Sequence, residues 1–136
     1  MKQKILLVED NDPLRENTSE LLELHNYQVY TACDGREGIE LALSKRPDLI
    51  LCDILMPEID GFCLLKYIRS HPILSHTYVV FFSANAQKNE VQYGLEIGAN
   101  DYLVKPFTEA ELLACLKKHE KSSPVNILKS INQVPS

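Results

Sequence analysis

Residues 49–61 read LILCDILMPEIDG, a stretch that starts like a core strand and ends like a turn. The apolar run at 49–51 suits a buried strand, but Asp53 follows it directly after Cys52. A buried charge is costly to desolvate, so this carboxylate must be neutral, paired or bound to a cation. The Met-Pro and Asp-Gly pairs that follow predict a loop at the end of the strand. Which state Asp53 adopts depends on the segments that meet it.

Four other short apolar runs alternate with segments of helical periodicity. Several of the runs are continuous, which is typical of strands buried on both faces of a parallel sheet. The five runs lie at residues 5–8, 29–32, 49–52, 78–82 and 102–104. Five β-α units in succession predict an α/β fold, a doubly wound (βα)5 sandwich with a five-stranded parallel sheet. Right-handed crossovers then place helices on both faces of the sheet.

The segments between the runs have apolar residues at the i, i+3, i+4 spacing of amphipathic helices. Pro13 predicts the start of the first helix, while Pro47 and Pro72 predict the ends of the second and third. The fourth pattern, over residues 91–98, is weaker than the fifth, over residues 112–116. We therefore expect five helices, one after each strand.

The composition is that of a globular protein with one domain. Of 136 residues, 45% are hydrophobic and 24% are charged. The formal net charge of −5 argues against contact with nucleic acid, which needs a basic face. No apolar stretch approaches the ~18 residues of a membrane span, and the run after Lys4 is too short for a signal peptide. We expect a folded domain over residues 1–120 and a C-terminal tail or linker stub over residues 121–136.

The cysteines and histidines show no metal-binding pattern of their own. The cysteines form no CxxC pair, so we interpret them as small core side chains in a reducing cytoplasm. The histidines are scattered without ligand spacing, so we expect no metal site built on them. These residues are Cys33, Cys52, Cys63 and Cys115, and His25, His71, His76 and His119.

Chemistry-bearing side chains follow four of the five runs. In open α/β sheets, ligands bind outside the carboxyl ends of the strands, where this chain places Glu9, Asp10, Asp53, Ser83 and Lys105. Three carboxylates at one edge repel one another unless a cation lies among them, and all-oxygen ligands suit Mg²⁺. The lysine adds a fixed positive charge and the serine a hydroxyl donor. Together they predict a pocket for a phosphoryl group, with Asp53 ionised and able to act as a nucleophile.

Each of these signals has an ordinary explanation when it stands alone. An acidic pair such as Glu9-Asp10 often caps a helix, and an Asp or a Lys-Pro pair often forms a turn. Their coincidence at one edge of the predicted sheet favours a site. No glycine-rich phosphate loop accompanies them, so nucleotide binding has no support.

Four segments in this order and spacing resemble the receiver domain of two-component response regulators. The segments are ILLVEDN, LILCDILMPEIDGF, VVFFSANA and GANDYLVKPF, and the resemblance extends over about residues 3–120. It implies a flavodoxin-like sheet with strand order 2-1-3-4-5 and a cis peptide bond between Lys105 and Pro106. It also implies a switch that accepts a phosphoryl group from a sensor histidine kinase or a histidine phosphotransfer protein.

The resemblance assigns a role to each residue of the predicted pocket. Asp53 corresponds to the phospho-acceptor, Ser83 to the hydroxyl position and Lys105 to the lysine of the site. The expected Mg²⁺ ligands are Glu9, Asp10, Asp53 and the backbone carbonyl of Leu55, and the expected switch residues are Ser83 and Tyr102. Phosphorylation should then alter the surface formed by the fourth helix, fifth strand and fifth helix.

Two other functions stay open. A Mg²⁺-dependent phosphatase would use Asp53 as nucleophile but needs a second acid two residues later, where Leu55 stands. A receiver-like interaction module that is never phosphorylated would lack acids or the lysine, all of which are present. We expect no enzyme activity beyond the chain's own phosphorylation. The sequence leaves open the output partner or domain, a longer parent protein and a dimer that forms on phosphorylation.

Overall fold

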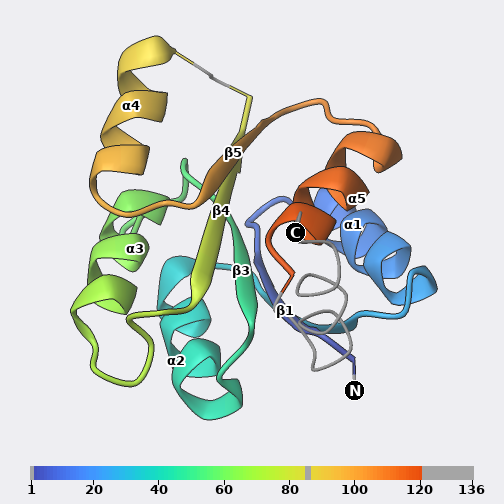
Figure 1. Cartoon of the computed structure of the whole chain (residues 1–136), viewed down its shortest axis with the longest axis horizontal. Helices are drawn as coiled ribbons and strands as arrows, with labels where there is room; N and C mark the ends of the chain where they lie inside the picture. The colour runs from blue at the N-terminus through green and yellow to red at the C-terminus, as the bar shows by residue number, and fades with distance from the viewer. Residues whose placement is uncertain (1, 85–86, 121–136) are drawn as a thin grey trace, which may run out of the picture.

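Five parallel strands form one sheet in the order β2-β1-β3-β4-β5. Figure 1 shows this sheet with helices on both of its sides, in a computed structural model of the chain. The strands are β1 (Lys4–Val8), β2 (Gln28–Ala32), β3 (Leu49–Asp53), β4 (Tyr78–Ser83) and β5 (Asp101–Val104). The helices are α1 (Asp12–Leu24), α2 (Gly35–Lys45), α3 (Gly61–Ser70), α4 (Lys88–Glu96) and α5 (Glu109–Lys118). The predicted fold is confirmed. The structure describes residues 2–84 and 87–120, so the expected tail at 121–136 lies outside the described residues.

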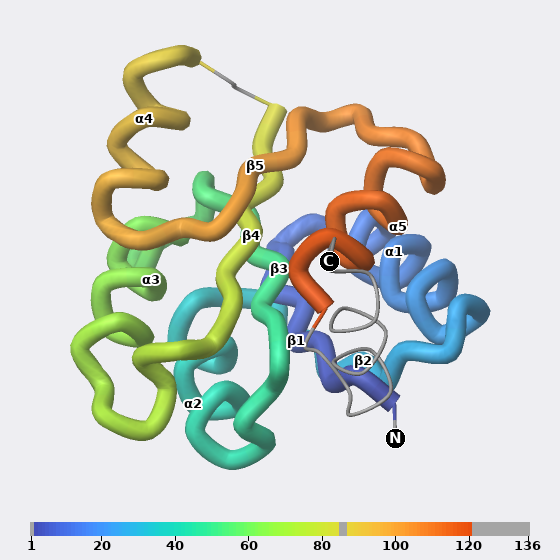
Figure 2. The backbone as a smooth tube through the Cα atoms, in the orientation of Figure 1, coloured from blue at the N-terminus to red at the C-terminus, as the bar shows by residue number. Residues whose placement is uncertain are grey.

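The sheet separates two buried clusters because successive side chains of a strand point to opposite faces. Leu6 and Val8 of β1 lie in a cluster that α2 and α3 cover, whereas Ile5 and Leu7 lie in one that α1 and α5 cover. Figure 2 shows α1 and α5 on one side of the sheet and α2, α3 and α4 on the other. The central strand β3 is buried at every position, which explains its continuous apolar run.

Side-chain caps define where four of the helices begin. Asn11, Asp34 and Asp60 accept hydrogen bonds from backbone N–H groups in the first turns of α1, α2 and α3. Thr108 and Glu111 form a reciprocal capping box at α5. The helix starts therefore follow from polar residues that satisfy N–H groups without an intrahelical partner.

The fourth helix differs from its prediction. α4 has no side-chain cap hydrogen bond and ends at Glu96, so Gly98 lies beyond it. Gly98 has a φ of 116°, which a residue with a side chain rarely adopts. The prediction that the helical pattern continues to Gly98 is therefore wrong, because this glycine belongs to the turn that leads to β5.

The interpretation of the cysteines as core side chains is right for two of them and wrong for two. Cys52 and Cys115 are buried, whereas Cys33 and Cys63 are exposed. Cys33 lies in the loop before α2, and Cys63 lies in the first turn of α3 on its solvent side. Within the described ranges, none of the helices has the combination of length and apolarity that a membrane crossing needs.

Candidate functional site

Three carboxylates meet at the carboxyl ends of β1 and β3. These strands are neighbours, with Val8 opposite Cys52, so the residues that follow them lie side by side. One oxygen each of Glu9, Asp10 and Asp53 lies within 4.8 Å of the others. Glu9 and Asp53 are buried and Asp10 is exposed. Clustered carboxylate oxygens are a donor set that fits a hard divalent cation.

Lys105 reaches this cluster from the far side of β4. Its ammonium nitrogen lies 2.6 Å from Glu9 Oε1 and 3.0 Å from Asp53 Oδ2. The same nitrogen lies 4.8 Å from the centre of the Phe82 ring, and the Lys105 N–H donates to the Ser83 carbonyl. The peptide bond to Pro106 is cis, as the family resemblance implied. Lys105 is thus held between the two buried carboxylates.

Burial dominates the electrostatics of the acidic cluster. It raises the pKa of Glu9 from 4.5 to about 7, although the hydrogen bond from Lys105 opposes this shift. Burial would lower the pKa of Lys105, but the hydrogen bonds to Glu9 and Asp53 outweigh it, so that pKa is raised. Without a metal ion, one lysine therefore serves two buried acids, and Glu9 is partly protonated near neutral pH. A divalent cation would offset the repulsion between the carboxylates of Glu9 and Asp53.

Backbone groups hold the two buried carboxylates in place. The Leu55 N–H donates to Asp53 Oδ1 over 3.2 Å, which leaves Oδ2 to Lys105. The Asn11 N–H donates to Glu9 Oε2 over 3.3 Å. The structure thus places Leu55 beside Asp53 through its amide, and its carbonyl as a metal ligand stays a prediction.

The loop after β3 packs closely against the strand end. The Gly61 N–H donates to the Ile54 carbonyl, and a side-chain carbon at position 61 would lie 2.7 Å from the Asp53 carbonyl oxygen. This is too close for any residue but glycine. The Asp-Gly pair at 60–61 therefore serves both the cap of α3 and the approach of the loop to Asp53.

Ser83 and Tyr102 lie on neighbouring strands of the same edge. Ser83 ends β4 and is buried, while Tyr102 of β5 is partly exposed and packs edge-on against Phe81. Burial raises the pKa of Tyr102, and a hydrogen bond with the Ser83 side chain opposes that shift. The two residues predicted to act as a switch are therefore in contact. Asn85, two residues beyond Ser83, lies outside the described residues.

An apolar hollow adjoins the acidic cluster. Its volume is about 370 Å³, and it is lined by Leu14, Ala84, Lys105, Pro106 and Phe107. Nothing in the sequence pattern predicted that Leu14 lines a hollow beside the site. The Pro106-Phe107 pair gave only a weak indication that a hollow lies here, since the sequence shows no more than an apolar pair directly after Lys105.

Comparison with known proteins shows the family to which the chain belongs. Residues 5–117 match the family model described as the response regulator receiver domain. The transcriptional regulatory protein CseB of Streptomyces avermitilis is 40% identical over 113 residues, which cover 83% of this chain and 47% of CseB. The chain belongs to the receiver domain family of response regulators. It spans about half the length of the curated relatives it matches.

Solved structures show the same fold. The chemotaxis protein CheY4 of Vibrio cholerae superposes with a TM-score of 0.83 at 33% identity, covering 87% of this chain and 98% of CheY4. The receiver domain of sensor histidine kinase PA1611 from Pseudomonas aeruginosa has a TM-score of 0.80 at 34% identity, covering 87% of this chain and 97% of that domain. The PA1611 structure is described with a magnesium ion coordinated in its active site cleft.

Proposed function

We propose that this chain is a signalling switch whose Asp53 accepts a phosphoryl group from a phosphohistidine. The observation that carries this proposal is the position of Asp53, which is buried, 3.0 Å from Lys105 and within 4.8 Å of two further acids. The donor is a sensor histidine kinase or a histidine phosphotransfer protein. The receiver domain comprises residues 1–120, and the exchange takes place in the cytoplasm.

The transfer uses the oriented carboxylate as nucleophile. An Asp53 oxygen forms a bond to phosphorus while the bond from phosphorus to the histidine nitrogen breaks, and that electron pair stays on the imidazole. The Leu55 N–H orients the carboxylate, and Lys105 supplies a fixed positive charge next to the transferred group. Asp10 and Asp53 would hold Mg²⁺ directly, the Leu55 carbonyl would assist, and Glu9 would contribute mainly through water. When bound, the metal ion would supply positive charge that neutralises the phosphoryl oxygens.

The apolar hollow beside Lys105 supports a macromolecular donor. Leu14 of α1 and Phe107 lie on its rim, so a partner helix can bury apolar side chains there while its histidine faces Asp53. A small phosphomonoester would gain little from such a surface. This favours the switch over a phosphatase, as does Leu55 at the position of the missing second acid.

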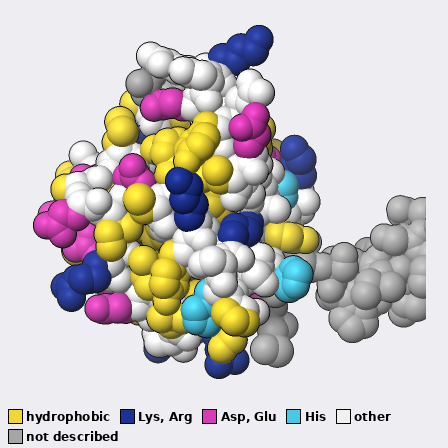
Figure 3. All heavy atoms as spheres, turned by 90° about the vertical axis from the view of Figure 1, so that its left-hand side faces the viewer, with side chains coloured by type: hydrophobic (Ala, Val, Ile, Leu, Met, Phe, Trp, Pro, Cys, Tyr) yellow, Lys and Arg dark blue, Asp and Glu magenta, His cyan; other side chains and the backbone are white. Residues whose placement is uncertain are grey.

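Phosphorylation would act through Ser83 and Tyr102. Phosphoryl oxygens on Asp53 would recruit the Ser83 hydroxyl, which the structure places in contact with Tyr102. The affected face, formed by α4, β5 and α5, carries the exposed side chains of Tyr93, Leu95 and Val104. Figure 3 views the molecule from the side that carries α3 and α4 and shows hydrophobic side chains gathered there. An output partner, or a second copy of the chain, would bind on this face.

Intact mass spectrometry after incubation with acetyl phosphate and Mg²⁺ tests the proposal. The parent chain should gain one phosphoryl group, and Asp53→Asn should gain none. Asp34→Asn is the matched control, because Asn also caps a helix and Asp34 lies outside the site. Labelling that survives in Asp53→Asn would overturn the assignment. Steady release of phosphate from a small phosphomonoester would favour the phosphatase instead, and a parent chain that is never labelled would favour the interaction module.

A further inference from the structure

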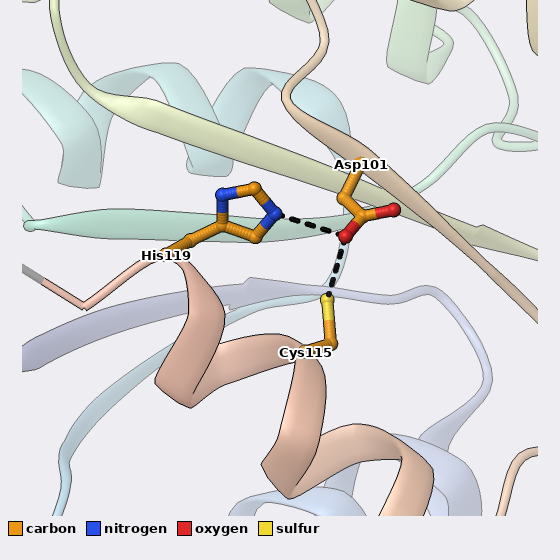
Figure 4. A group of neighbouring side chains, drawn as sticks. All are labelled: Asp101, Cys115 and His119. Carbon is orange, nitrogen blue, oxygen red and sulfur yellow. Dashed lines mark hydrogen bonds and ion pairs between the residues drawn. The ribbon is translucent and has the colours of Figure 1, made fainter.

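Three different donor side chains converge at the opposite end of the sheet from Asp53. Asp101 is the first residue of β5, Cys115 lies in α5 and His119 is the cap residue after α5. One potential ligand atom of each lies within 4.8 Å of the others. Figure 4 shows the side chains of Cys115 and His119 pointing toward the Asp101 carboxylate. Cys115 and His119 are four residues apart and so lie on the same face of the helix. None of the three belongs to the acidic cluster around Asp53.

The donors already point at one atom. His119 Nε2 lies 2.9 Å from Asp101 Oδ2, and Cys115 Sγ lies 3.6 Å from the same oxygen. Zinc binds sulfur, nitrogen and oxygen at about 2.0–2.3 Å, so tetrahedral ligands lie roughly 3.3–3.7 Å from one another. The two separations from Asp101 Oδ2 lie within about half an ångström of this range, and one potential ligand atom of each residue lies within 4.8 Å of the others. The three residues thus have nearly the arrangement of a metal site, with hydrogen bonds to Asp101 Oδ2 in place of bonds to an ion.

The site is accessible from solvent and has a competing cation. The Asp101 side chain is 27% exposed and that of His119 is 14% exposed, so an ion can enter from the surface. The ammonium group of Lys118 lies 3.4 Å from Asp101 Oδ2, and its side chain is 69% exposed. Lys118 can therefore leave the carboxylate when a metal ion replaces it.

The alternative of a nucleophilic cysteine does not fit this environment. Burial raises the pKa of the Cys115 thiol to about 12, and the Asp101 carboxylate adds to that effect. His119 Nε2 is hydrogen-bonded to Asp101, and within the described part of the chain no hydrogen bond joins the imidazole to the Cys115 sulfur. A thiol in this state has little reactivity, but a metal ion can displace its proton.

We propose that Asp101, Cys115 and His119 bind Zn²⁺, with a fourth position open to water. One sulfur, one nitrogen and one oxygen ligand suit zinc and do not suit Mg²⁺ or Ca²⁺. Binding would tie the last turn of α5 to the first residue of β5. This inference is independent of the proposed phosphorylation of Asp53.

Titration with Co²⁺, a spectroscopic substitute for Zn²⁺, tests the site. The protein carries Cys33→Ser and Cys63→Ser to remove its exposed thiols, and excess Mg²⁺ saturates the acidic cluster. Bound cobalt should show a thiolate-to-metal charge-transfer band that saturates at one equivalent and disappears when Zn²⁺ is added. Cys115→Ser should abolish the band, and His119→Gln or Asp101→Asn should weaken Co²⁺ binding by about tenfold or more.

Two variants of exposed side chains, which should not disturb the fold, serve as further tests of Co²⁺ binding. His25→Gln removes another histidine–carboxylate pair, 2.7 Å from His25 Nε2 to Glu109 Oε1, and should leave Co²⁺ binding unchanged. Lys118→Gln should tighten binding by about twofold to fivefold, the effect of removing one exposed charge. A missing band, a band that persists in Cys115→Ser, or unchanged or weaker binding in Lys118→Gln would overturn the proposal.

Discussion

The ammonium nitrogen of Lys105 lies 2.6 Å from Glu9 Oε1, although 96 residues separate the two in the sequence. Both side chains are largely withdrawn from solvent, at 17% and 1% exposure. The same nitrogen contacts Asp53, so a single lysine joins the ends of β1, β3 and β5. A phosphoryl group or metal ion bound at Asp53 would therefore act on the ammonium group that holds these strand ends together.

The raised pKa of Glu9 should make the metal-free protein less stable as the pH rises. The folded protein holds a proton on Glu9 that the unfolded chain releases above its ordinary pKa of 4.5. This contribution to the free energy of unfolding is fully present below pH 4.5 and is lost as the pH rises through about 7. Denaturant titrations in a chelator measure it. Glu9→Gln should flatten this part of the profile, and identical profiles for parent and variant would contradict the assignment.

Removal of Asp10, the exposed acid of the cluster, should have opposite effects on the stability of the metal-free protein and on its affinity for Mg²⁺. In the absence of Mg²⁺, Asp10→Ala should raise the free energy of unfolding by about 1 kcal/mol, because it relieves repulsion with Glu9 and Asp53. The same change should weaken Mg²⁺ binding by about tenfold or more, since a carboxylate ligand is lost. Glu20→Ala, an exposed acid on α1, is the control and should change neither. Equal Mg²⁺ affinity in Asp10→Ala and the parent would argue against the site.

Gly61→Ala should destabilise the protein and disturb Asp53. The new carbon would lie 2.7 Å from the Asp53 carbonyl oxygen and 2.8 Å from Ile54 Cα, both backbone atoms that cannot turn aside. We expect a loss of about 1–3 kcal/mol in the free energy of unfolding, together with slower labelling by acetyl phosphate. Gly94→Ala is the comparison, because its nearest contacts are ring atoms of Phe81 at 3.2 Å and alanine favours a helix. A larger loss for Gly94→Ala would count against this reasoning.

A phosphate mimic should reveal the switch surface. Beryllofluoride bound at Asp53 should shift the backbone amide signals of residues 83–84 and 87–107 far more than those of α2. The physical reason is the contact between Ser83 and Tyr102, which links the site to β5. Tyr102→Ala should confine the shifts to the residues that contact Asp53. Shifts confined in this way in the parent chain as well would mean that no switch operates.

The phosphorylated form should be long-lived. Hydrolysis needs a water opposite phosphorus, and the Leu55 side chain, which is 59% exposed, cannot hydrogen-bond to it. Leu55→Asn should speed the loss of the phosphoryl group from the isolated chain, because a polar side chain can orient that water. Intact mass measured over time gives the rate. Unchanged or slower decay would show that position 55 does not govern the lifetime.

Local patterns in the sequence determined the fold and the candidate residues. The apolar runs and the turn residues between them are short-range signals, so the five strands and the end of the third helix could be predicted. The rule that parallel strands present their carboxyl ends at one edge was enough to bring Glu9, Asp10 and Asp53 together. The weak pattern of α4 failed at Gly98, since only the structure shows its positive φ.

The tertiary structure alone decided which side chains touch. The sequence placed Lys105 at the right edge, but its contacts with Glu9 and Asp53 depend on how far the side chain extends across β4. The histidines predict no metal site by their spacing, because His119 meets Cys115 and Asp101 only where the end of α5 lies next to the start of β5. Helix packing and strand register set such distances, and spacing along the chain does not encode them. For the same reason the sequence could not show that Cys33 and Cys63 face solvent while Cys52 and Cys115 are buried.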